Sequence, residues 1–274
     1  MSPRRPLVMG IVNVTPDSFS DGGRLDTPEA ALDHAMALIG DGADILDIGG
    51  ESTRPGAEPV PEAEEIARTV PLIEAVRARW NGRISIDTMK PQVARAAVAA
   101  GATIWNDVTA LSFSPDSPAV AADLGCEVVL MHMKGEPRTM QIDPRYDDVV
   151  TDVRDALAGR AGVAIAAGVA RDRIWLDPGI GFGKTVEHNL ALTVRLGELV
   201  ALGFPVLYAA SRKRMIQAID PAAADPLHRL GGSLALALEA AARGARMIRV
   251  HDVRETVQAL KVQAVLSGAA AQVI

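Results

Sequence analysis

Residues 83–108 read RISIDTMKPQVARAAVAAGATIWNDV, and this stretch contains the unit from which the whole fold is predicted. It starts with a short apolar strand candidate, residues 83–88, and continues into an Ala-rich run with helical periodicity that begins at Pro91. Pro suits the first turn of a helix, and the Gly101 that follows the run is typical of a helix end. A second strand candidate, residues 103–108, completes a strand–helix–strand unit.

The same alternation repeats along the chain. Short runs rich in Val and Ile predict eight strands, at residues 7–14, 44–50, 83–88, 103–108, 127–133, 173–179, 205–211 and 246–252. These runs are apolar on both faces, which is typical of a parallel sheet. Eight strand–helix units in about 250 residues match a closed barrel better than an open sheet, which would more often carry a Gly-rich fingerprint after its first strand. The sequence therefore predicts an α/β protein with a (β/α)8 TIM barrel that forms a single domain over residues 1–274.

Composition and charge exclude several classes of protein. The net charge is -6, whereas a general binder of nucleic acids or membrane surfaces would present a basic face. The single cysteine, Cys126, rules out an internal disulfide, fits a reducing compartment and is interpreted as part of the core. The apolar run near the N-terminus is too short for a signal peptide or a membrane span. We therefore expect a cytoplasmic protein with no nucleic-acid partner and no membrane partner.

Nearly every predicted strand ends in a polar residue. In a parallel barrel all these ends meet at one rim, where enzymes of this fold build their active sites. The strand ends supply Asn13, Asp87, Asn106, Asp107, His132, Asp177, Ser211 to Lys213, Arg249 and His251. One polar strand end is ordinary, but so many ends of mixed chemistry indicate a ligand pocket.

Two groups of these residues suggest particular chemistry. Arg249 and His251 lie two residues apart on a strand, so their side chains share a face. An Arg beside a His suits an anionic group such as a phosphate, and the alternative is a buried salt link that closes the barrel. Asp87, Asn106 and Asp177 combine acceptors with an amide, which matches the edge of a nitrogen heterocycle with several N–H donors. A metal site is the rival interpretation for this trio, and the weak Asn ligand disfavours it.

The loops after the strands are less easily interpreted. DPGIGFGKT, residues 177–185, fits neither a P-loop nor a G-x-G-x-x-G fingerprint, because its glycines have the wrong spacing. It is either a mobile connection or a loop in which Phe182 covers a flat ligand. SRKR, residues 211–214, follows an apolar strand directly, so we expect Lys213 to turn inward and to be functional; the alternative is plain surface charge. HMKGEPRTMQ, residues 132–141, predicts a rim loop of unassigned role.

The ordered set of motifs resembles that of the dihydropteroate synthase family. The motifs are NVTPDSFSDGG, GGESTRPGA, SIDT, NDV, MHMKG, DPGIGFGKT, SRK and RVHDV, and together they span essentially the whole chain. The resemblance implies a barrel enzyme that joins 6-hydroxymethyl-7,8-dihydropterin diphosphate to 4-aminobenzoate, releasing diphosphate and forming 7,8-dihydropteroate for tetrahydrofolate biosynthesis. It also implies a homodimer and a target of sulfonamides.

The same resemblance implies a role for each site residue. The pterin would contact Asp87, Asn106, Asp177 and Lys213. A Mg²⁺ ion would bind Asn13, with Asp17 and Asp21 on the same loop. The diphosphate would face Thr53, Arg54, Arg249 and His251. The 4-aminobenzoate would be lined by Phe19, Pro55, Phe182, Ser211 and Arg212. The residues expected to act in catalysis are Lys213, Arg249 and His251.

The chain departs from the family pattern at two places. Tyr208-Ala209-Ala210 precedes Ser-Arg-Lys where the family usually has a Gly, so a large ring or an extra methyl near the pterin would alter the pocket volume. Arg214 stands where a small residue is common and would add charge on the 4-aminobenzoate side. Two alternatives stay open. One is a pterin-binding methyltransferase acting with a corrinoid protein, which needs no diphosphate site, and the other is a non-catalytic barrel homologue.

Overall fold

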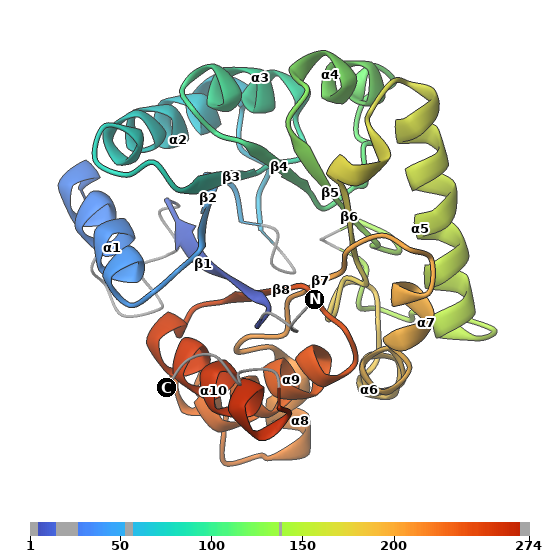
Figure 1. Ribbon diagram of the computed structural model, residues 1–274. Coiled ribbons are helices and arrows are strands. Elements are labelled where there is room, and N and C mark those ends of the chain that lie inside the picture. Colours follow the sequence, from blue (N-terminus) through green and yellow to red (C-terminus); the bar gives the residue numbers. More distant parts are fainter. Residues whose placement is uncertain (1–4, 15–26, 53–56, 137–138, 269–274) are drawn as a thin grey trace.

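All eight predicted strands are present, and they form one parallel sheet that curls into a barrel (Figure 1). The computed structural model describes residues 5–14, 27–52, 57–136 and 139–268. The strands are β1 Leu7–Asn13, β2 Ile45–Gly49, β3 Arg83–Asp87, β4 Ile104–Asp107, β5 Glu127–Met131, β6 Ile174–Asp177, β7 Leu207–Tyr208 and β8 Met247–Val250. Their order in the sheet is β6-β5-β4-β3-β2-β1-β8-β7. The predicted α/β barrel is therefore confirmed, and its organisation as a single domain stays a prediction.

The ring closes between β6 and β7 with few backbone contacts. Leu176 of β6 forms an isolated parallel bridge with Val206, just ahead of β7. The amide of Leu176 donates a hydrogen bond to the carbonyl of Pro205 at 3.0 Å. The two ends of the sheet order are thus joined, and the carboxyl ends of the strands face one rim as the barrel geometry requires.

Helices follow the strands and surround the barrel (Figure 1). They are α1 Pro28–Gly40, α2 Glu62–Arg77, α3 Pro91–Ala99, α4 Ser117–Leu124, α5 Val149–Ala166, α6 Val186–Val194, α7 Gly197–Val200, α8 Arg214–Ile219, α9 Leu230–Ala242 and α10 Val253–Leu266, with 3-10 turns η2 Arg171–Arg173 and η3 Pro226–Arg229. The helix start predicted at Pro91 is confirmed, and Thr27 caps α1 by accepting from the amide of Ala30 at 3.2 Å. In the described part of the chain, no helix has both the length and the apolar character needed to cross a membrane.

The core has two apolar layers because side chains alternate along each strand. The inner layer fills the barrel with Met9, Ile45, Ile104, Val129, Trp175, Leu207 and Met247. The larger outer layer packs the strands against the helices. Cys126 belongs to this outer layer, where burial raises the pKa of its thiol to about 11, so it is a core residue as expected.

The next layer of the barrel interior, on the rim side of the inner apolar layer, consists of polar residues. Two residues after Ile45, Ile104, Trp175 and Met247, the strands carry Asp47, Asn106, Asp177 and Arg249. The alternation of a strand keeps each of these on the same inward face as its apolar predecessor. The inner layer thus forms an apolar plug, and a polar layer lies on it toward the rim.

Tyr208 points out of the barrel, contrary to the expectation that its ring would alter the pocket. Its side chain is fully buried in the outer layer. Its hydroxyl lies 2.7 Å from Oγ1 of Thr193 on α6, and Thr193 Oγ1 in turn donates to the carbonyl of Asn189. The expectation was wrong for Tyr208 because Leu207 takes the inward position, which sends the next side chain outward.

We expect Tyr208→Phe to lower the free energy of unfolding by about 1 kcal/mol, because it removes one buried hydrogen bond without changing the ring. Urea denaturation measures the change. Thr193→Val removes the partner of the same bond, so the double variant should lose less than the sum of the two single losses. Strict additivity would contradict the pairing.

Candidate active site

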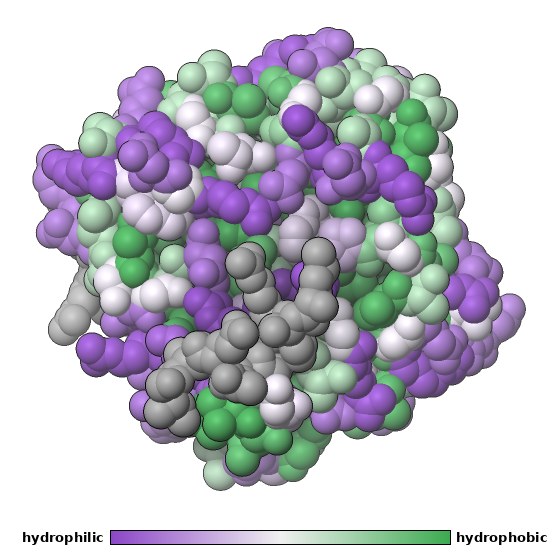
Figure 2. Space-filling view, viewed as in Figure 1, coloured by the Kyte–Doolittle hydropathy of each residue, from purple (hydrophilic) through white to green (hydrophobic). Residues whose placement is uncertain are grey.

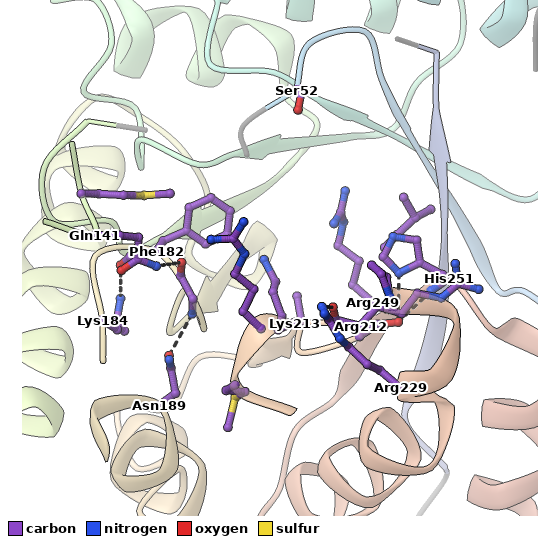
Figure 3. A pocket seen from close by; sticks show the side chains of 18 of the residues that line it. Ser52, Gln141, Phe182, Lys184, Asn189, Arg212, Lys213, Arg229, Arg249 and His251 are labelled. Carbon is purple, nitrogen blue, oxygen red and sulfur yellow. Dashed lines mark hydrogen bonds between the residues drawn. The ribbon is translucent and has the colours of Figure 1, made fainter. Parts of the chain in front are cut away.

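A cavity of about 630 Å³ opens at the carboxyl ends of the strands (Figure 3). Its volume is in the range of sites for small molecules. Eight of the predicted site residues line it, namely Asn13, Asp87, Phe182, Ser211, Arg212, Lys213, Arg249 and His251. They come from four strand ends and from the loop after β6, so the expected convergence at one rim is observed. Hydrophilic side chains also gather around the middle of the face in Figure 2.

Two other predicted residues lie next to the cavity without lining it. Asn106 is 4% exposed and Asp177 is 3% exposed, so both are buried in the polar layer. Ala209 and Arg214, which mark departures from the family pattern, do line the cavity. The remaining predicted residues lie outside the described residues; they are Asp17, Phe19, Asp21, Thr53, Arg54 and Pro55.

A buried ion cluster forms the floor of the cavity. Arg249 donates from Nε to Oδ2 of Asp47 at 2.5 Å and from Nη2 to Oδ2 of Asp87 at 2.7 Å. The amide of Asn106 donates to the same oxygen of Asp47 at 3.1 Å. The salt link considered as an alternative for Arg249 therefore exists, and Arg249 lines the cavity as well.

Sequence reasoning missed Asp47, which holds this floor together. Asp47 has no exposed surface and binds both Arg249 and Asn106. The signal was a carboxylate in the middle of the apolar run DILDIGG, residues 44–50. A charged residue inside a buried strand requires a partner, so this position could have been singled out.

Burial dominates the protonation of the carboxylates in the polar layer. It raises the pKa of Asp87 to about 7, against the opposing effect of the Arg249 guanidinium. Burial likewise raises the pKa of Asp177 to about 6, although its Oδ1 accepts from the amide of Gly179 at 2.7 Å. Both groups can therefore change protonation state close to neutral pH, when a ligand adds or removes charge nearby.

Asp107 and His132 were expected at the rim pocket, and neither lines the cavity. The carboxylate of Asp107 accepts hydrogen bonds from the amides of Thr109 and Leu111, at 2.7 and 2.8 Å, so it caps its own turn. His132 Nδ1 lies 3.0 Å from Nζ of Lys184. Burial lowers the pKa of His132 to about 3, so its ring is neutral.

Cations form the wall opposite the floor. Lys213 does turn inward, and its Nζ lies 4.3 Å from the centre of the Phe182 ring, which is a cation–π contact. Arg212 pairs with Asp252 at 2.6 Å. Oγ of Ser211 lies 3.0 Å from Nδ1 of His251. Lys213 of SRKR thus lies in the cavity wall, and its functional role stays a prediction.

Three further buried side chains support the site and were not predicted. Arg229 binds four groups, among them the carbonyl of Arg212 at 2.9 Å. Lys90 pairs with Glu65 at 2.6 Å and with Glu51, and Glu51 lines the cavity. Lys184 is 3% exposed and lies at the edge of the cavity. The partners of these three side chains are distant in the sequence or lie on loops. No local sequence pattern therefore predicts that the three residues support the site.

The described residues alone do not provide a full set of ligands for a metal ion. No three His, Cys, Asp or Glu side chains among the described residues are grouped closely enough to hold one. Asn13 lines the cavity and offers an amide oxygen, which is a hard ligand of the kind that Mg²⁺ prefers. A cation here would therefore need most of its ligands from a bound anion, from water, or from residues outside the described part.

A (β/α)8 barrel with a cavity of this kind defines an enzyme that takes a small polar ligand at its rim. The pterin binding enzyme family matches residues 9–251. Dihydropteroate synthase of Escherichia coli (strain K12) is 48% identical, over 96% of this chain and 93% of the relative. The chain therefore belongs to the pterin binding enzyme family and, within it, groups with the dihydropteroate synthases.

Solved structures agree with that assignment. Yersinia pestis dihydropteroate synthase with a sulfonamide drug complex is 45% identical, with a TM-score of 0.92, over 96% of this chain and 95% of that one. The dihydropteroate synthase from Xanthomonas albilineans in complex with 7,8-dihydropteroate is 45% identical, with a TM-score of 0.84, over 96% of this chain and 93% of that one.

We expect the empty protein to lose stability through Asp87 as the pH rises. The folded-state pKa of about 7 lies above the ordinary value for Asp, so the stabilisation is complete below about pH 4 and is lost as the pH rises through 7. Asp87→Asn lacks this titration. Its stability relative to the wild type should therefore increase by about 1 kcal/mol or more between pH 5 and pH 8.

Urea denaturation at both pH values measures this difference. Asp33→Asn, which removes an exposed carboxylate on α1, supplies the baseline. A constant difference between Asp87→Asn and the wild type across this range would refute the raised pKa.

Proposed function

We propose that the protein condenses 6-hydroxymethyl-7,8-dihydropterin diphosphate with 4-aminobenzoate to give 7,8-dihydropteroate and diphosphate in tetrahydrofolate biosynthesis. One observation carries the proposal. One cavity is lined by the carboxylate of Asp87, by several cations and by an aromatic side chain, Phe182, and the buried carboxylate of Asp177 lies next to it. These features correspond to the three chemical parts of the reactants, namely a heterocycle rich in N–H donors, a diphosphate and a flat arylamine. The Xanthomonas structure with bound 7,8-dihydropteroate supports it.

The alternatives have less support. A methyltransferase acting with a corrinoid protein needs no cationic wall for a diphosphate. A non-catalytic homologue would be expected to have lost a site residue, and every predicted site residue is retained in the sequence. The relatives that match over nearly the full length bear the name of the synthase.

The floor is the proposed binding site of the pterin. Asn106 and Asp177 are buried and Asp87 is largely so, and they therefore require partners for any hydrogen-bonding capacity that they do not satisfy among themselves. A pterin offers ring and amino N–H groups to the carboxylates and an acceptor edge to Lys213. A mismatch at one of these buried contacts would cost about 1–3 kcal/mol, which makes the floor selective.

The diphosphate is proposed to face Arg249 and His251, together with Thr53 and Arg54 outside the described residues. Ser211 Oγ accepts from the amide of His251 at 3.2 Å and lies 3.0 Å from Nδ1 of the ring, so its hydroxyl can donate to Nδ1. That arrangement favours a His251 tautomer with its proton on Nε2, which can donate to a phosphate oxygen. Arg249 supplies a charge that never titrates in the working range.

The proposed chemistry needs charge stabilisation more than proton transfer. The bond between the exocyclic methylene and the diphosphate oxygen breaks, and the electron-rich ring spreads the positive charge that remains. The neutral arylamine then attacks the methylene carbon and afterwards loses a proton to solvent. Lys213, Arg249 and His251 stabilise the negative charge of the departing diphosphate from fixed positions, and each such contact is typically worth about 10²–10³-fold in rate.

We further propose Mg²⁺ as the cofactor, held by Asn13 and by the substrate's diphosphate, with Asp17 and Asp21 on the same loop. The scarcity of metal-binding groups among the described residues fits an ion that keeps several waters and binds mainly through substrate phosphates. When bound, the ion neutralises charge on the leaving diphosphate.

A homodimer is also proposed. Apolar side chains are exposed on helices of the second half of the barrel, including Val194 of α6 at 54% and Leu266 of α10 at 82%. Figure 2 also shows apolar side chains over the region of α8 to α10 at the bottom of the view. Such faces are buried in many homodimers. A cytoplasmic location is proposed on the basis of the unpaired thiol of Cys126.

A coupled assay for diphosphate release with both substrates tests the proposed reaction. The wild type should release diphosphate only when 4-aminobenzoate is present. Lys213→Ala should reduce turnover by about 10²-fold or more, since it removes a positioned charge. Lys213→Arg should restore only part of the activity, because a planar guanidinium needs more room than a compact ammonium.

Absence of amine-dependent diphosphate release by the wild type would overturn the proposed function. Full activity of Lys213→Ala, by contrast, would leave the reaction intact and remove Lys213 from its mechanism.

Metal dependence is tested by titrating the protein with diphosphate in a calorimeter. Diphosphate should bind at least about tenfold more tightly with Mg²⁺ than with a chelator, and Asn13→Ala should abolish most of that gain. We expect 4-aminobenzoate to bind measurably only to protein that holds diphosphate and Mg²⁺. Tight binding of 4-aminobenzoate to the free protein, unaffected by chelator, would exclude both the metal role and an ordered mechanism.

A further inference from the structure

Two loops at the rim, one after β5 and one after β6, are built against each other as a single unit. A Cβ atom at Gly179 would lie 2.0 Å from the carbonyl oxygen of His132, and one at Gly183 would lie 2.2 Å from that of Lys134. Both glycines also have positive φ angles, of 66° and 63°. Only glycine allows the two backbones to approach so closely. The spacing of DPGIGFGKT therefore serves loop packing.

Side chains reinforce this packing at several points. The hydroxyl of Tyr146 donates to the carbonyl of Gly183 at 2.8 Å, and Nε2 of Gln141 donates to the carbonyl of Gly181 at 2.7 Å. On the other side, Oδ1 of Asn189 in α6 accepts from the amide of Gly181 at 2.8 Å. The loop after β6 is thus held on both sides, and Phe182 lies at its centre (Figure 3).

Lys184 sits where the two loops join. Its Nζ lies 3.0 Å from Nδ1 of His132, and it donates to the carbonyls of His132 at 3.2 Å and Phe182 at 3.0 Å. All three partners are neutral, and no carboxylate of the described residues lies within ion-pair distance. Burial accordingly lowers the pKa of Lys184 to about 7. A buried ammonium without a counter-ion is a poor source of stability, so its presence indicates a positional role.

Phe182 is the side chain that Lys184 positions. The bond from Lys184 fixes the Phe182 carbonyl, while the ring faces the cavity and lies against Nζ of Lys213. The backbone of Phe182 is therefore fixed on one side by the first lysine, and its ring is contacted on the other side by the second. Without Lys184 the peptide between Phe182 and Gly183 would lose a hydrogen-bond donor, and the ring could rotate out of the wall.

We propose that Lys184 is a positioning residue for the second substrate, which acts by fixing Phe182 in the wall of the cavity. The inference rests on the proposed function, since it concerns the 4-aminobenzoate side of that same site. The carboxylates and the amide proposed to bind the pterin, those of Asp87, Asp177 and Asn106, stand on strands, and Lys184 forms no hydrogen bond with them. Lys184 should therefore affect one substrate and spare the other.

Steady-state kinetics of Lys184→Met separates these effects, because methionine keeps the apolar stem and removes the three donors. KM for 4-aminobenzoate should rise about tenfold or more, as expected for the loss of one buried contact of about 1.4 kcal/mol. KM for the pterin diphosphate should change by less than about threefold. Lys261→Met, which removes an exposed lysine of α10, is the matched control and should change neither constant.

A double-variant cycle tests whether Lys184 acts through Phe182. In a Phe182→Ala background, Lys184→Met should raise KM for 4-aminobenzoate by less than about twofold, because the ring it positions is gone. Multiplicative effects would mean that Lys184 acts independently of Phe182, and they would overturn the proposal. Equal increases of both KM values in Lys184→Met would overturn it too, as the mark of a general structural role.

Tyr146→Phe provides a milder variant if Lys184→Met does not fold. It removes one bond to the same loop at Gly183, so KM for 4-aminobenzoate should again rise while that for the pterin diphosphate stays constant. Unchanged KM values in Tyr146→Phe would count against the coupled loops. An inactive wild type would instead contradict the proposed function, so the two failures are distinguishable.

Discussion

The guanidinium of Arg249 lies between the carboxylates of Asp47 and Asp87, and the polar half of the barrel depends on this interaction. A carboxylate without exposed surface, such as that of Asp47, requires a partner. Arg249 provides that partner from the strand on the opposite side of β1, so one cation ties β8 to β2 and β3. The carboxylates of Asp47 and Asp87 share the single positive charge of Arg249, so one cation faces two acidic groups in the floor.

This imbalance explains the chemistry of the floor. Burial raises the pKa of Asp87 by more than the positive charge of Arg249 lowers it. In addition, Oδ1 of Asp47 has no hydrogen-bond partner among the described residues. A ligand that brings N–H donors into the cavity improves the electrostatic balance there. A ligand that also carries a diphosphate competes for Arg249 itself. The floor thus suits a molecule that combines both properties, and binding of its two parts is coupled through one guanidinium.

Most of the barrel was predictable from the sequence because its signals are local. Apolar runs fix the strands, and the polar residue after each run lies at the rim whatever the rest of the chain does. Pairing across the barrel has no such signal: Arg249 and Asp47 are 202 residues apart. Lys184 was equally hidden, since its partners are mostly backbone carbonyls. Tyr208 was misjudged because the two-residue strand β7 gives too little pattern to tell its inner from its outer face.

The floor of the cavity is formed by residues on strands, whereas the opposite wall is formed mainly by residues on loops. Strands carry Asp87, Asn106, Asp177 and Arg249. Asp87 and Asn106 are paired with a neighbouring strand on both sides, and Asp177 and Arg249 are paired on one side. The opposite wall depends on Phe182 and Lys213, which lie in loops and at the start of a short helix. A strand residue cannot shift without breaking its backbone hydrogen bonds. The position of a loop residue, by contrast, depends on the side-chain contacts that hold the loop. The cation–π contact, the close glycine packing and the hydrogen bonds of Lys184 are such contacts. Substitutions in this wall can therefore alter the fit of a flat amine, or of a molecule that imitates it, while the floor remains unchanged.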